Sequence, residues 1–89
     1  MMKKTKRTKD FTAAMSADMK QVAARIREHR EAIGLSRPKF AEVLEMPPTT
    51  LKNYELRYRT TGGEFLVKFG KQYGAERLLW LMGLDTPNG

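Results

Sequence analysis

Few side chains in this 89-residue chain could perform catalysis or bind a metal. His29 is the single histidine, and there is no cysteine, which excludes disulfides, thiolate metal sites and a cysteine nucleophile and fits a reducing cytosol. His29 has no cluster of acidic neighbours, so we expect it at the edge of the core rather than in a reactive site. No nucleophile, metal-ligand or phosphate-cradling motif is present. The sequence therefore predicts a protein that is not an enzyme and that needs no metal or cofactor.

Charge is the strongest signal in the composition, and it is concentrated in residues 1–60. The formal net charge is +7 at pH 7, of which residues 1–10 contribute +4 and residues 20–60, with nine basic and five acidic side chains, another +4. Residues 61–89 are balanced, with three charges of each sign, and Asp18 completes the sum. This asymmetry predicts one surface that faces a polyanion and one face left for another partner, with a merely solvated basic surface as the alternative.

The chain is long enough for one domain with a modest core. Its longest apolar run, from Leu78 to Met82, is too short to cross a bilayer, and its basic start lacks the apolar block of a secretory signal. We therefore expect a cytoplasmic protein without membrane contact.

The pattern of apolar residues predicts an all-α fold. Residues 1–15 are rich in lysine and threonine and predict a flexible basic arm. The helix that follows should start at Ser16 and stop at Gly34, with a left-handed glycine at its end. Apolar residues spaced by three, four and seven positions mark its buried stripe: Met19, Val22, Ile26 and Ile33, with Ala23 beside them.

Four shorter helices should follow. The second begins after Ser36, with Pro38 in its first turn and an inner face of Phe40, Ala41, Val43 and Leu44. Pro47 breaks the chain and Pro48 opens the third helix, whose inner residues are Leu51 and Tyr54. A loop from Arg57 to Gly63 leads to a fourth helix with Phe65, Leu66, Phe69 and Tyr73, which stops at Gly74. The fifth runs through Leu78 to Met82. The expected division is an arm (1–15), one helical domain (16–84) and an exposed tail (85–89).

The second and third helices have the packing residues of a helix-turn-helix. Ala41 lies where the two helices cross, and a larger side chain there would spread their steep crossing angle. Met46 fills the turn. Residues 25–74 resemble the phage repressor and Cro family, often called Xre-like, through Arg30-Glu-Ala-Ile-Gly-Leu-Ser, Phe40-Ala-Glu-Val-Leu and Leu51-Lys-Asn-Tyr-Glu. The resemblance implies a five-helix, repressor-like domain that binds double-stranded operator DNA, and the lysine-rich arm resembles the arm that some phage repressors wrap around DNA.

Three positions depart from the family pattern. Glu45 stands where the turn usually has glycine, so a side chain must accept left-handed geometry or the turn must differ. Pro47 replaces the usual serine cap of the third helix. Arg37 replaces the usual glutamine, which puts an amide contact in doubt and favours phosphate binding.

The resemblance implies a set of DNA contacts. The outward face of the third helix would reach base edges, where asparagine suits adenine, lysine suits guanine, and threonine or proline can touch a thymine methyl. The members of this face are Pro48, Thr49, Lys52 and Asn53. Phosphate contacts are expected from Arg37, Lys39, Thr50, Arg57, Arg59 and Thr60. The arm adds Lys3, Lys4, Lys6, Arg7 and Lys9.

Two further features concern assembly. The resemblance implies an ion pair between Arg30 and Glu55 that positions the third helix. The fifth helix is apolar nearly all round, which favours a homodimer contact over core filling alone; its candidate contact residues are Leu79, Trp80, Met82 and Leu84.

The expected function is a nucleoid-associated transcriptional regulator, a repressor of phage or mobile-element type that binds its operator as a dimer. Two alternatives use the same scaffold. One is an antitoxin that represses its own operon while another surface masks a toxin. The other is an antirepressor that binds a protein and no DNA.

Overall fold

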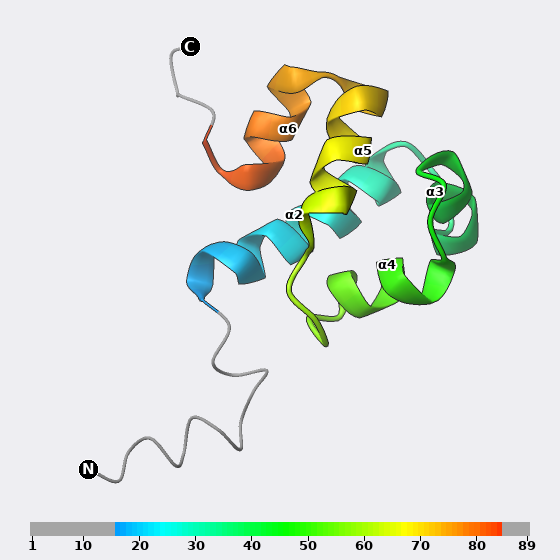
Figure 1. Ribbon diagram of the computed structural model, residues 1–89, viewed down its shortest axis with the longest axis horizontal. Helices are drawn as coiled ribbons and strands as arrows, with labels where there is room; N and C mark the ends of the chain where they lie inside the picture. Colours follow the sequence, from blue (N-terminus) through cyan, green and yellow to red (C-terminus); the bar gives the residue numbers. More distant parts are fainter. Residues whose placement is uncertain (1–15, 85–89) are drawn as a thin grey trace, which may run out of the picture.

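The computed structural model describes residues 16–84, which form five helices around one core (Figure 1). The helices are α2 (Ala17–Ala32), α3 (Arg37–Val43), α4 (Pro48–Glu55), α5 (Gly63–Tyr73) and α6 (Ala75–Met82). No strand occurs within residues 16–84, so the all-α prediction is confirmed. Helix α2 packs against α4 and α6, α3 packs against α4, and α5 packs against α6. The arm and the tail lie outside the described residues.

Cap residues determine where the helices begin and end. The Ser16 hydroxyl accepts a hydrogen bond of 3.1 Å from the amide of Met19, and Ser36 caps α3 in the same way. Gly34 follows α2 with φ of 75°, which is the left-handed stop expected from the sequence. Helix α6 begins at Ala75, three residues before the apolar run that predicted it, because Gly74 with φ of 99° reverses the chain directly after α5.

The core gathers the inner faces of all five helices: Val22, Ile26, Phe40, Ala41, Leu44, Leu51, Phe65, Phe69 and Leu81. Two residues expected there are exposed instead. Ile33 follows the last residue of α2, so it no longer continues the buried stripe. At about 100° per residue, Val43 lies on the flank of the stripe that Phe40, Ala41 and Leu44 form.

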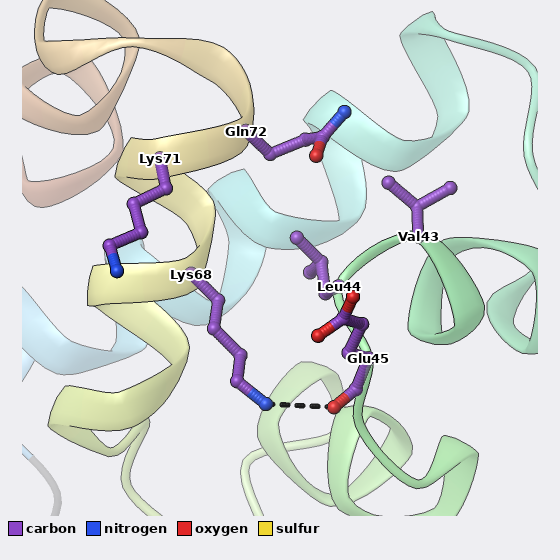
Figure 2. Close-up of a pocket in the computed structure, with 6 residues that line it drawn as sticks. All are labelled: Val43, Leu44, Glu45, Lys68, Lys71 and Gln72. Atoms are coloured by element: carbon purple, nitrogen blue, oxygen red, sulfur yellow. Dashed lines mark hydrogen bonds between the residues drawn. The ribbon is translucent and has the colours of Figure 1, made fainter.

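The turn between α3 and α4 is left-handed at a residue that is not glycine. Glu45 has φ of 55°, in the left-handed region. The amide of Met46 bonds to the carbonyl of Ala41 at 2.9 Å, which closes a Schellman motif at the end of α3. Lys68 of α5 donates a hydrogen bond of 2.8 Å to the carbonyl oxygen of Glu45 (Figure 2). The turn is therefore fixed to α5 from outside the helix-turn-helix.

Glu45→Gly should raise the free energy of unfolding by about 1 kcal/mol, because an L side chain in the left-handed region costs about 1–2 kcal/mol and glycine avoids most of that cost. The bond from Lys68 is to the backbone and should survive the change. Urea denaturation measures the shift. The matched control is Glu28→Gly at an exposed position inside α2, which should lose about 1 kcal/mol. A loss of stability in both variants would show that the turn is not strained.

His29 lies inside the core and not at its edge, so the sequence-based expectation was wrong. It is 4% exposed and is surrounded by the rings of Tyr73, Phe69 and Phe40, at centroid distances of 4.4, 4.8 and 5.8 Å. Its Nδ1 accepts a hydrogen bond of 3.0 Å from Nε of Arg77, which places the ring proton on Nε2. Burial lowers the pKa of His29, and the positive charge of Arg77 lowers it further. The imidazole is therefore neutral in the folded protein at pH 7.

The stability of the protein should decrease in mild acid because of His29. Its folded pKa lies below the unfolded value of about 6.5, so as the pH falls the unfolded state takes up the proton first. The free energy of unfolding should be constant above about pH 7.5 and decrease as the pH falls through about 6.5, until the folded-state pKa is passed. Urea midpoints at several pH values measure this. His29→Phe removes the only histidine and should abolish the decrease; an unchanged decrease in that variant would assign it to other groups.

Candidate nucleic-acid interface

Helix α4 is held along one side and open along the other. Leu51 is fully buried, and the ring of Tyr54 packs edge-on against Phe65 at 5.8 Å. Pro47 gives the helix no side-chain cap, and Pro48 supplies its first residue, as the sequence predicts. Pro48, Thr49 and Lys52, on the opposite side, are exposed.

Glu55 ties the end of α4 to α2 and α3. Its side chain is fully buried, and its two carboxylate oxygens receive Arg30 in a bidentate pair of 2.8 and 3.1 Å. The ion pair implied by the family resemblance is therefore present. Arg30 also donates to the carbonyl of Leu35 at 2.9 Å, which connects the pair to the chain between α2 and α3.

Arg37 is a third member of this network. Its Nε lies 3.0 Å from Oε1 of Glu55, and its side chain remains 32% exposed. The sequence predicts only a phosphate contact for Arg37, because no local pattern shows that residue 37 lies beside residue 55. In the structure it fixes the start of α3 to the end of α4, and only its exposed part is open to a ligand.

The four candidate base-reading residues share the open side of α4. Pro48, Thr49 and Lys52 are exposed, and Asn53 is half-buried. The spacing of four between Thr49 and Asn53 places them one turn apart on the same face. The carbonyl of Asn53 accepts the amide of Tyr58 at 2.8 Å, so its backbone closes the helix. Asn53 makes no side-chain hydrogen bond among the described residues.

The candidate phosphate-binding residues divide into three groups. Arg57, Arg59 and Thr60 are exposed in the loop directly after α4, where Arg57 takes φ of 64°. At the start of α3, Lys39 is exposed and lies 3.9 Å from the carboxylate of Glu42. Thr50 is not on the open face of α4: it is half-buried and lines a cavity of about 190 Å³ between the turn and α5.

Tyr58 is an exposed aromatic residue that the sequence analysis missed. It stands between the exposed Arg57 and Arg59, at the end of the open face of α4. The signal was available in the sequence as an aromatic side chain between two arginines, a combination that suits stacking and backbone contact on nucleic acid.

The four candidate dimer residues lie in different environments. Helix α6 ends at Met82, so Leu84, which was expected in this helix, follows it after Gly83. Leu79 and Leu84 are 43% and 60% exposed, and Met82 is half-buried. Trp80 is partly buried, and the guanidinium of Arg77 lies 3.8 Å and that of Arg25 5.3 Å from its ring centroid. Arg25 also donates to the carbonyl of Trp80. Exposed apolar surface is therefore provided by Leu79 on α6 and by Leu84 just after it, rather than by Trp80.

Within residues 16–84, no group of three or more potential ligand side chains that could hold a metal ion occurs. In the same residues, no helix is both long and apolar enough to cross a membrane. The arm residues Lys3, Lys4, Lys6, Arg7 and Lys9 lie outside the described residues.

Comparison of the chain with protein-family models, curated proteins and solved structures gave no match.

Proposed function

We propose that this protein is a sequence-specific DNA-binding regulator, a repressor of phage or mobile-element type that acts on the nucleoid. One observation carries the proposal most directly. The open face of α4 presents Pro48, Thr49, Lys52 and Asn53, while its buried end is fixed by Glu55 to two arginines from two other helices. A helix held this rigidly and left open on one side suits readout of base edges.

Helix α4 would lie in the major groove. The diameter of an α-helix with its side chains, about 10–12 Å, matches the width of that groove, about 12 Å. Asn53 suits the N6 and N7 of an adenine, and Lys52 suits the O6 and N7 of a guanine. Arg57 and Arg59 follow the helix and would meet phosphates, which position the protein without reading sequence.

A dimer would read two half-sites of a symmetric operator. Leu79 of α6 and Leu84 just after this helix supply exposed apolar side chains, distant in the chain from the α4 face. Two copies related by a two-fold axis would place their recognition helices about one helical turn of DNA apart. The basic arm, Lys3 to Lys9, would add phosphate contacts.

Selection from a pool of randomised duplexes tests this proposal. The wild-type protein should enrich an inverted repeat whose half-site centres are about 10 base pairs apart. Mutation of one base pair in a half-site should weaken binding by about 1–3 kcal/mol. Recovery of unenriched sequences, bound with equal affinity, would leave a general polyanion binder and contradict the proposal.

A regulator with a protein partner is the second candidate. Val67 of α5 is exposed, as are Leu79 and Leu84. This apolar surface would bind a toxin if the protein is an antitoxin, or a target protein if it is an antirepressor. An antitoxin would still bind its own upstream DNA, whereas an antirepressor would not. A gel shift with the upstream region of its own gene separates these two cases.

A further inference from the structure

A basic groove lies between α2 and the loop after α4. It has a volume of about 320 Å³ and is lined by Lys20, Ala24 and Arg27 of α2 together with Glu55, Leu56 and Arg57. Lys20, Ala24 and Arg27 are spaced by four and three positions, so one face of α2 forms the whole of one wall. Ala24 is small and leaves the middle of that wall open between two cations.

The charge of this groove is positive in spite of the carboxylate in its lining. Glu55 is fully buried and is paired with Arg30 at 2.8 Å and Arg37 at 3.0 Å, so two cations face its single negative charge. Arg27 is 61% exposed, and only its Nε bonds to Glu31, at 2.9 Å. Lys20 and Arg57 make no ion pair within residues 16–84. Three cations therefore line the groove, and its one acidic side chain, Glu55, is already neutralised by its ion pairs.

The groove continues the open face of α4. Leu56 stands one turn after Lys52 and forms part of the groove lining, so the face of α4 runs into the groove without a barrier of acidic residues. Arg57 belongs to both surfaces, as a lining residue of the groove and the first residue after α4's cap. A strand of nucleic acid that passes the end of α4 would meet Arg57 first and α2 next.

We infer that this groove binds a phosphodiester group of duplex DNA, with Lys20 and Arg27 of α2 as additional phosphate ligands beside Arg57. The inference rests on the proposed function and extends its contact surface from the helix-turn-helix onto α2. The groove suits a compact anion, because cations line both of its walls and the only acidic group in its lining is already neutralised. Lys20 acts as a point charge on the phosphate, and Arg27 offers the amino groups that Glu31 does not occupy.

The test measures affinity for a selected duplex over a range of salt concentrations, by fluorescence anisotropy. Lys20→Ala should reduce the slope of log affinity against log salt by about 0.9 for each subunit bound. The loss of affinity between about 50 and 200 mM salt should shrink correspondingly, by about 3.5-fold per subunit. Glu31→Gln releases Arg27 from its ion pair and removes a negative charge, so it should tighten binding severalfold at low salt.

Lys71→Ala is the matched control, because Lys71 is an exposed lysine of α5 that lines a different cavity, beside Val43 and Leu44 (Figure 2). It removes the same charge and should leave the slope unchanged. Equal slopes for Lys20→Ala and wild type would overturn the inference while DNA binding itself stands. Equal reductions in the Lys20→Ala and Lys71→Ala slopes would also overturn it, since net charge alone would then explain them.

A second arm separates DNA phosphate from free phosphate. Thermal unfolding is followed with increasing inorganic phosphate, for wild type and for Lys20→Ala. Weak stabilisation that Lys20→Ala reduces, together with the slope change on duplex, supports the inference. If phosphate stabilises the wild-type protein but the same protein binds no duplex, the groove is a site for a free anion. That result would overturn both the assignment of the bound phosphate to DNA and the proposed function.

Discussion

Glu55→Ala should lower the free energy of unfolding by on the order of 3 kcal/mol, because it leaves a mostly buried arginine without its partner. The Arg30 side chain is only 11% exposed, and both of its bonds to the carboxylate would be lost, as would the bond from Arg37. A domain of this size has a total stability of about 5–15 kcal/mol, so the variant should unfold at a much lower urea concentration. The measurement is the urea midpoint followed by circular dichroism.

A double-mutant cycle shows whether the effect comes from the pair. Arg30→Ala with Glu55→Ala should cost less than the sum of the two single changes, since neither charge is then left alone. Arg37→Ala should cost less than Arg30→Ala because its side chain is more exposed. Strict additivity for Arg30 and Glu55 would show that the two residues are not coupled.

Asn53→Ala should weaken binding to a selected duplex by about 1–3 kcal/mol and have little effect on random duplex. The loss should be confined to one or two base pairs in each half-site, because Asn53 lies on the open face of α4 one turn after Thr49. Titrations of both duplexes at one fixed salt concentration measure the difference.

Arg57→Ala is the control for that comparison. Arg57 follows the cap of α4 and is expected to reach only the backbone, so its loss should weaken binding to both duplexes about equally. If Asn53→Ala weakens binding to the selected and the random duplex by the same amount, Asn53 contributes to binding of any sequence and does not read a base.

Much of the fold could be predicted from the sequence because its signals are local. Ser16, Ser36, Gly34 and Pro48 set helix ends through their own backbone and side-chain chemistry, and the structure places the ends there. At Glu45 the sequence leaves two geometries open, and the structure has the left-handed one. Signals of this kind depend on neighbours within four or five residues.

Contacts between distant residues could not be predicted in the same way. His29 continues the buried stripe of α2, three residues after Ile26, but its partners Arg77 and Tyr73 come more than forty residues later, and no spacing in α2 indicates them. Trp80 is similarly held by Arg25, 55 residues before it. The groove beside Lys20 depends on the position of Arg57, which the packing of α2 against α4 sets. The sequence pattern of a single helix shows which of its faces is apolar. It does not show which side chains of other helices will contact its polar residues.

Dimethyl sulfate footprinting on a selected duplex tests the central claim most directly, because the reagent reports both grooves in one experiment. Guanine N7 lies in the major groove and adenine N3 in the minor groove. If α4 reads the major groove, the protein should protect guanine N7 in two half-sites about one helical turn apart, and Asn53→Ala should alter the pattern within each half-site. Binding that leaves every guanine N7 reactive, or protects only adenine N3, would contradict a recognition helix in the major groove.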